Sequence, residues 1–242
     1  MTRNILKVAA IFLVGMVGGI FADQIFWPYF VERPLFYEYR LEKNPVYLTE
    51  VKEITVEENT ALRTSIEKVE KTVVGVRAQT EGGLALEGSG LVVTSDGLMV
   101  TLAELVPQGS SFGFYVEGKK VSYQVLKRDM ENNLALVKLG EANLPTVSFA
   151  NLKLLEPGER VFLVGTIFEL IEGEFQPVNL VNEGIVKSFS KDFIKTNIFE
   201  NHLLAGSPLF NIKGEVLGLN TIDFEGKVIT IPITVIKDFI GL

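Results

Sequence analysis

Short runs of β-forming residues, separated by turn residues, fill the chain from Thr72 onward, and this pattern limits the fold more than any other feature. The runs are rich in Val, Ile, Leu and Phe, and turns such as Ser95-Asp96-Gly97 and Glu117-Gly118 contain glycine where a positive φ is needed. Short strands with regular turn signals are typical of all-β sandwiches and barrels. The expected strands cover 73–78, 89–93, 98–101, 112–116, 121–126 and 134–139, and then 161–164, 180–189, 193–196, 215–222 and 228–231.

These strands form two groups on either side of a linker at 145–158. Two groups of about six strands predict two antiparallel barrels, with any site in the cleft between them. The first barrel is expected over 72–144 and the second over 155–232, and a closing helix is expected over 233–240. At 47% apolar residues, 242 residues are enough to bury such a core.

The N-terminus carries a candidate membrane anchor at 1–27. An unbroken apolar run from Val8 to Ala22 follows Arg3 and Lys7, and it extends to 5–27 if Lys7 snorkels. Trp27, Tyr29 and Phe30 would then form an aromatic belt at the far interface. The basic flank predicts a single pass through the cytoplasmic membrane, with the N-terminus in the cytoplasm and the β domain outside. A cleaved signal peptide is the alternative, because the strictly apolar core is short, but Ile20 and Ala22 match an A-x-A cleavage site poorly.

A juxtamembrane arm is expected at 28–71. Pro28, Pro34 and Pro45 should break any long helix in its first part. Within 57–71 the apolar residues recur at helical spacing, which predicts a short amphipathic helix leading into the first barrel.

Composition excludes several classes of function. The net charge is −7, from 23 basic and 30 acidic residues, which argues against a nucleic-acid partner. The chain has no cysteine, so disulfides, thiolate nucleophiles and cysteine-based zinc sites are excluded. We see no cofactor motif and no metal-binding pattern, and we predict neither.

From Gly88 onward the chain resembles the HtrA (Deg) branch of the trypsin-like serine proteases, which have the chymotrypsin fold. The resemblance covers about two-thirds of the chain and rests on the order and spacing of its landmarks. These are GSGLVVTSDGLMVT at 88–101, LALVKL at 134–139, PGERVFLVG at 157–165, NEGIVKS at 182–188, PLFNIKGEVLGLNT at 208–221 and ITIPI at 229–233.

The resemblance also locates the positions of the family's catalytic triad. The base position falls on Glu104, the aspartate position on Asn133 and the nucleophile position on Ala205. Acyl transfer needs a hydroxyl to attack, an imidazole to accept its proton and a carboxylate to orient the imidazole. None of the three is present, so we predict a pseudoprotease.

The loop that forms the oxyanion hole in the family also departs from the motif. Leu203 replaces its first glycine, and we expect a remodelled loop over Leu203, Leu204 and Ala205. His202, the one histidine of the chain, is more typical of a structural residue than of a base at this place. An unconventional nucleophile, Ser207 with a lysine, remains an alternative.

Three functions remain open: a peptide-binding or scaffold pseudoprotease, a hydrolase with residual activity, and a purely structural membrane protein. By resemblance, a peptide ligand would pair with Thr221, Ile222 and Asp223 in the cleft between the barrels. The family also assembles through N-terminal aromatic residues, so a homo-oligomer formed through Phe36, Tyr37 and Tyr39 is expected. Because the printed chain ends at Leu242, soon after the closing helix, we expect no PDZ domain.

Overall fold

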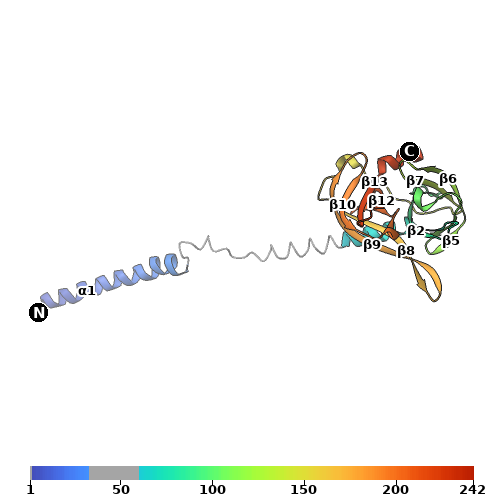
Figure 1. The fold of residues 1–242 in the computed structure, drawn as a ribbon. Helices are drawn as coiled ribbons and strands as arrows, with labels where there is room; N and C mark the ends of the chain where they lie inside the picture. Colours follow the sequence, from blue (N-terminus) through green and yellow to red (C-terminus); the bar gives the residue numbers. More distant parts are fainter. Residues whose placement is uncertain (1, 33–59) are drawn as a thin grey trace. The chain divides into compact units, whose positions relative to one another are not determined.

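A computed structural model of the protein describes residues 2–32 and 60–242 (Figure 1). The chain divides into two compact units, Met1–Val56 and Glu57–Leu242. The arm aromatics Phe36, Tyr37 and Tyr39, like Pro34 and Pro45, lie outside the described residues.

The first unit contains an apolar helix. The α-helix α1 (Thr2–Phe21) continues into the π-helix η1 (Ala22–Glu32). Its stretch Arg3–Trp27 is 25 residues long, with a mean hydropathy of 2.3, and is long and apolar enough to cross a membrane. A signal sequence would meet the same criteria.

Pro28, one of the prolines expected to break any long helix in the arm, lies within η1, which continues to Glu32. A proline breaks an α-helix because it lacks an N–H and its ring meets a carbonyl of the preceding turn. Trp27 is 54% exposed.

The second unit begins with the predicted amphipathic helix, which is helical over residues 60–69 and ends in the 3-10 turn η3 (Glu70–Thr72). Leu62 and Ile66 pack against the domain core, and Val69 is completely buried. The Ser65 hydroxyl donates to the Ile212 carbonyl at 2.5 Å, which ties the helix to a distant turn.

The first group of strands forms one seven-stranded antiparallel sheet in the order β5-β4-β1-β2-β3-β7-β6. Its edge strands β5 and β6 are separated in the chain only by Ser122, so the two edges of the sheet meet there. One predicted strand, 121–126, is therefore two strands that pair with opposite edges, which accounts for seven strands in place of six. The bounds are β1 (Val73–Gln79), β2 (Ala85–Val92), β3 (Leu98–Leu102), β4 (Ser111–Val116), β5 (Lys119–Val121), β6 (Tyr123–Asp129) and β7 (Leu134–Leu139).

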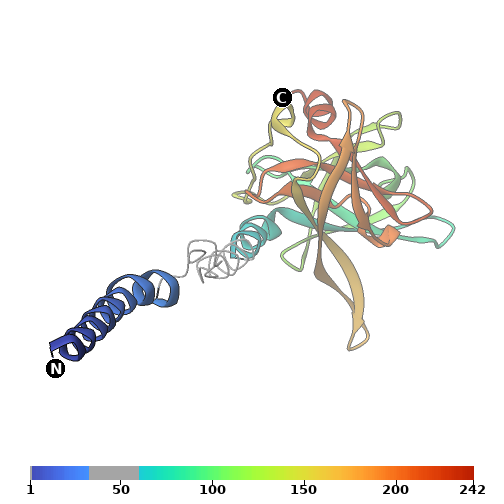
Figure 2. The same ribbon diagram turned by 90° about the vertical axis from the view of Figure 1, so that its left-hand side faces the viewer.

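The second group forms a closed six-stranded barrel in the order β10-β13-β12-β11-β8-β9. Its strands are β8 (Arg160–Ile171), β9 (Glu174–Phe189), β10 (Ile194–Phe199), β11 (Pro208–Asn211), β12 (Val216–Ile222) and β13 (Lys227–Pro232). β11 was not predicted as a separate strand, since it has only four residues. β8 and β9 are longer than predicted and form a hairpin that extends away from the domain (Figures 1 and 2).

One buried cluster joins the two groups of strands. It contains Val73, Leu91 and Val100 from the first sheet, and Phe162 and Phe210 from the second barrel. The closing helix α3 (Ile233–Ile240) adds three buried side chains to it. The expected all-β chymotrypsin-type architecture with a C-terminal helix is therefore confirmed, and its two halves share a core.

Candidate functional site

Glu104 lies in the 3-10 turn η4 (Ala103–Leu105), directly after β3. Its side chain is exposed, and its amide donates a 3.0 Å hydrogen bond to Oδ1 of Asn133. The Ala103 amide also donates to the carbonyl of Asn133, at 3.1 Å. Two of the three predicted positions are thus in direct contact, and Asn133 holds the backbone that carries Glu104.

Asn133 itself is held by the turn between β6 and β7. It has a φ of 52°, in the left-handed region that asparagine tolerates better than most residues. Asp129, at the end of β6, accepts hydrogen bonds from the side chain and amide of Asn132 and from the amide of Glu131. The Asn132 side chain is the main reason that the pKa of Asp129 lies below its ordinary value.

Ala205 follows the 3-10 turn η6 (His202–Leu204) and is 5% exposed. A Cβ placed on Gly88 would lie 2.5 Å from the Ala205 carbonyl oxygen and 2.5 Å from Cδ1 of Leu105. Leu105 and Ala205 therefore border the same point of β2. The fold brings the nucleophile position next to the turn that carries Glu104.

The backbone amides of the loop at 203–207 all donate hydrogen bonds to acceptors within the domain. The Leu203 amide donates to Oδ1 of Asn201 at 3.2 Å, and the Ala205 amide donates to the His202 carbonyl at 3.0 Å. The amides of Leu204, Gly206 and Ser207 donate to the carbonyls of Asn201, Asn220 and Leu204, respectively. An oxyanion hole needs amides that point at the reacting oxygen, and here those of Leu203 and Ala205 have other acceptors.

Ser207 is completely buried in a polar network behind the loop. Its hydroxyl oxygen accepts a 3.1 Å hydrogen bond from Nδ2 of Asn220, whose Oδ1 accepts a 2.6 Å hydrogen bond from the Thr230 hydroxyl. His202, in contrast, is exposed. The burial and the hydrogen bond of Ser207 indicate a structural role for this residue.

The candidate peptide-pairing residues lie at the end of β12. β11 pairs with β12 only as far as Leu219, and Asn220 exchanges backbone hydrogen bonds with Gly206 and Ser207 on that side. Because antiparallel strands alternate the direction of their hydrogen bonds, the backbone groups of Ile222 point to the same side, beyond the start of β11.

Asp223 is placed differently from Ile222. Its amide donates to the Lys227 carbonyl and its carbonyl accepts from the Gly226 amide, so both groups close the β12–β13 turn. Thr221 pairs with Ile229 of β13, and its hydroxyl donates to the Ile229 carbonyl. Of the three predicted residues, Ile222 has the backbone orientation that an added strand needs.

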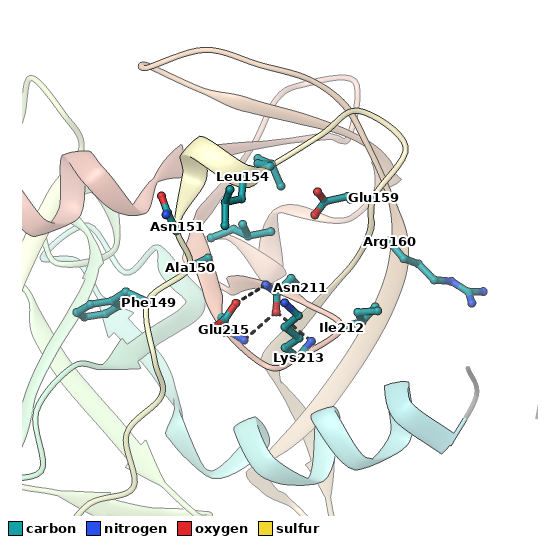
Figure 3. A pocket seen from close by; sticks show the side chains of 12 residues that line it. Phe149, Ala150, Asn151, Leu154, Glu159, Arg160, Asn211, Ile212, Lys213 and Glu215 are labelled. Atoms are coloured by element: carbon teal, nitrogen blue, oxygen red, sulfur yellow. Dashed lines mark hydrogen bonds between the residues drawn. The ribbon is translucent and has the colours of Figure 1, made fainter. Parts of the chain in front are cut away.

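A hollow of about 440 Å³ lies elsewhere on the domain (Figure 3). The Asn211 side chain organises the turn beneath it, bonding to the amides of Lys213 and Glu215 and to the Glu215 carboxylate. The lining residues belong to the segment 149–160 and to the β11–β12 region, and they include none of the three triad positions. Within residues 2–32 and 60–242, no group of three or more His, Cys, Asp or Glu residues could hold a metal ion.

Comparison with known proteins shows the family of this domain. The family described as Trypsin-like peptidase domain matches residues 88–219, a stretch that includes Glu104, Asn133 and Ala205. The chain is 29% identical over 172 residues to "Serine protease HTRA1" of Xenopus tropicalis, covering 65% of this chain and 36% of the relative. The chain belongs to the HtrA-type trypsin-like serine peptidases.

Two bacterial relatives give a similar picture. "Probable periplasmic serine endoprotease DegP-like" of Halomonas elongata is 28% identical over 159 residues, covering 62% of this chain and 34% of the relative. "Putative serine protease HhoB" of Synechocystis sp. is 31% identical over 162 residues, covering 60% of this chain and 37% of the relative. The HtrA-type chain thus spans about a third of the length of these curated relatives.

Sequence reasoning did not find several residues that shape this HtrA-type site. Asn201 caps the turn η6 through its side chain, and Asn-x-x before a short apolar run is a recognisable capping signal. Asn220 and Ser89 had no comparable signal, because their partners are far away in the chain. The Ser89 amide donates to the Ala205 carbonyl at 2.9 Å, and its hydroxyl accepts from the Thr166 amide at 2.8 Å.

Proposed function

We propose that this chain is a membrane-anchored, HtrA-like pseudoprotease that binds an extended polypeptide or acts as an assembly scaffold. The observation that carries the proposal is the loop from Leu203 to Ser207. A methyl group stands at the nucleophile position, and all five amides of the loop donate to acceptors within the domain. Both the attacking group and the stabilisation of the oxyanion are thereby lost.

The chemistry of acyl transfer supports inactivity. Ala205 has no hydroxyl, Glu104 offers a carboxylate where an imidazole is needed, and Asn133 carries no charge to stabilise an imidazolium. Loss of a single triad member lowers the rate by a factor of roughly 10⁴ to 10⁶. Here the oxyanion amides, which supply most of the residual rate in such enzymes, also have other partners.

Hydrolysis through Ser207 is the competing function, since the named relatives are serine proteases. The burial of Ser207 argues against it. Its hydroxyl is 0% exposed and accepts a hydrogen bond from Asn220, so a substrate carbonyl has no path to it. A nucleophile must lie within reach of both its base and the reacting atom.

Hydrolysis of an unfolded protein substrate tests inactivity. We expect no cleavage by the unmodified chain. Cleavage that Ser207→Ala abolishes would contradict the proposal. The triple variant Ala205→Ser, Glu104→His, Asn133→Asp should cleave the substrate only slowly, because the loop amides still donate to acceptors within the domain. Adding Leu203→Gly to this variant should raise its rate of cleavage.

Binding through the edge of β12 is the second part of the proposal. Backbone pairing with an added strand needs no triad, and Leu204 and Ile222 belong to one buried apolar cluster beside this edge. Ile222→Pro removes the amide that faces the edge without removing a hydrogen bond to β13. We expect it to weaken binding of a labelled unfolded polypeptide about tenfold in anisotropy titrations, while Asp223→Asn, in the adjacent turn, leaves binding unchanged. Equal binding by both variants would refute the proposed edge.

The apolar helix supports a proposal about location. The relative from Halomonas elongata is named periplasmic, and Arg3 and Lys7 precede the apolar stretch. We propose that the domain lies outside the cytoplasmic membrane, with the N-terminus inside. Protease added to spheroplasts should degrade the domain, and retention of the chain in carbonate-washed membranes would distinguish an anchor from a cleaved signal.

A homo-oligomer formed through the arm residues Phe36, Tyr37 and Tyr39 remains a separate proposal, tested by their joint replacement with alanine. We expect the replacement to lower the oligomer mass of the solubilised chain. An unchanged mass would remove this role from the arm.

A further inference from the structure

The side chain of Leu204, directly before the nucleophile position, is buried inside the second barrel. It is 1% exposed and belongs to the apolar cluster that also contains Leu163, Ile198 and Ile222. Its Cδ2 atom lies 2.5 Å from the point that a Cβ on Gly165 of β8 would occupy. A contact that short would force the leucine to move, so the side chain fits in this place because residue 165 is a glycine.

Successive side chains of this loop enter different surroundings. Leu203 is 40% exposed, whereas Ala205 belongs to the buried cluster of the first sheet, which includes Leu105. The Ala205 carbonyl is held as well, because it accepts the 2.9 Å hydrogen bond from the Ser89 amide. The loop is therefore fixed from two sides, by the second barrel at residue 204 and by the first sheet at residue 205.

The turn that directs the loop amides into the domain is short. η6 has three residues, and the amides of Leu204 and Ala205 donate 3.0 Å hydrogen bonds to the carbonyls of Asn201 and His202, respectively. A 3-10 turn has poorer hydrogen-bond geometry than an α-helix, so tertiary contacts must supply much of its stability. Burial of one leucine side chain shifts an equilibrium by a factor on the order of thirty.

We infer that Leu204 is a positioning residue, whose burial against Gly165 fixes the loop in the conformation in which the amides of Leu203 and Ala205 donate within the domain. The cleft is thereby held in a state that does not stabilise an oxyanion, whichever residue occupies position 205. Inactivity is then built into the core of the second barrel as well as into the triad positions. This inference deepens the proposed function and rests on it only for the assignment of Ala205 to the nucleophile position.

Hydrogen exchange of the full chain in detergent, followed by mass spectrometry, tests the role of Leu204. Leu204→Ala should increase exchange in residues 202–207 about thirtyfold relative to β13, because the loop opens while the barrel stays folded. Leu217→Ala is the matched control. Leu217 is also 1% exposed and belongs to the same cluster, but it lies on β12, outside the loop. Its replacement should increase exchange in the loop no more than in β13.

The contact with Gly165 predicts a coupling between two variants. Gly165→Ala places a methyl group against Cδ2 of Leu204, so it should displace the leucine and increase exchange in the loop about tenfold. Leu204→Ala removes Cδ2. The double variant should therefore exchange in the loop no faster than Leu204→Ala alone, as expected for residues in direct contact.

A chemical readout separates the orientation of the amides from a general loss of stability. In the triple variant Ala205→Ser, Glu104→His, Asn133→Asp, the introduced hydroxyl can react with a fluorophosphonate probe, whose phosphoryl oxygen gains negative charge during the attack. Adding Leu204→Asn, which has a similar volume but a polar end that resists burial, should raise the labelling rate at least tenfold. Adding Leu217→Asn should not raise it.

Equal exchange of the loop in Leu204→Ala and Leu217→Ala would overturn this inference, and so would a labelling rate that Leu204→Asn leaves unchanged. Faster loop exchange and faster labelling that are specific to residue 204 support it. Hydrolysis by the unmodified chain would contradict the proposed inactivity without altering the exchange comparison, so the two conclusions can fail separately.

Discussion

At the scale of single residues, the site depends on backbone positions that tolerate few side chains. Gly206, directly after the nucleophile position, has a φ of 76°, and a Cβ there would lie 2.2 Å from the Ser89 carbonyl oxygen. Because that oxygen belongs to the backbone of β2, it cannot move aside as a flexible side chain would. The loop of Ala205 is therefore built around this glycine.

We predict that Gly206→Ala lowers the free energy of unfolding by more than 2 kcal/mol, on the order of the left-handed penalty plus the steric clash. Gly173→Ala is the matched control, because its φ is 88° but nothing lies within 4 Å of the added Cβ. It should lose only about 1 kcal/mol. Urea denaturation of both variants checks this, and equal losses would show that strain at φ alone dominates.

Protonation of Asp129 should weaken the turn between β6 and β7 at low pH. Hydrogen bonds, chiefly from the Asn132 side chain, hold the pKa of Asp129 below its ordinary value. Its stabilisation of the turn is thus complete above the unfolded-state pKa of about 3.9 and is lost as pH falls through the lower pKa of the folded chain. The amide resonances of Asn132 and Asn133 should titrate with a midpoint below the ordinary carboxyl value of about 3.9. The titration should disappear in Asp129→Asn, and a midpoint above the ordinary value would contradict the prediction.

At the scale of elements, the β8–β9 hairpin is longer than the barrel requires. Its distal pairs run from Ile167↔Val178 to Ile171↔Glu174, and Arg77 and Tyr115 of the first sheet contact its aromatic residues. Arg77 also lies 3.1 Å from Glu87 on the neighbouring strand, which holds the guanidinium in place. One side chain of the first sheet thereby orients an element of the second barrel.

We predict that Arg77→Ala increases hydrogen exchange in residues 168–178 about fivefold, the effect of losing roughly 1 kcal/mol of cation–π interaction. Glu87→Gln removes the ion pair but keeps the guanidinium over Phe175. It should change exchange in the hairpin little. Exchange that rises equally in both variants would assign the orientation to the ion pair.

At the scale of the whole domain, the two groups of strands unfold together if their common cluster is their main support. Phe162 and Phe210 stack with centroids 5.4 Å apart and are completely buried in the cluster that also contains Val73 and Leu91. The closing helix binds the first sheet as well, because Lys127 of β6 donates to the Phe239 carbonyl at 3.1 Å. These contacts cross between the sheets at several places.

We therefore predict a single cooperative unfolding transition for residues 57–242. Phe162→Ala should shift the whole transition and lower the stability by about 3–5 kcal/mol. Circular dichroism in the far and near ultraviolet should give coincident curves for both proteins. Two separate transitions would show that the barrels are independent folding units.

The sequence by itself determined the fold class and predicted the positions of the triad. Short apolar runs with glycine turns specify strands locally, and Asn133 and Gly206 keep residue types suited to their positive φ values. The absence of a hydroxyl at position 205, and of any histidine other than His202, follows from residue identities alone. These conclusions required no tertiary structure because each depends on a residue type or a local pattern.

Only the tertiary structure decided how the loop, the strands and the hairpin are arranged. The Gly206 amide finds its acceptor on Asn220, and the Ala205 carbonyl finds its donor on Ser89, more than a hundred residues earlier. The division of one predicted strand at Ser122 depends on the opposite edges with which its halves pair. Hydrogen-bond partners and strand edges are properties of long-range pairing, so they emerge when the sheet closes and cannot be read from local patterns of residues.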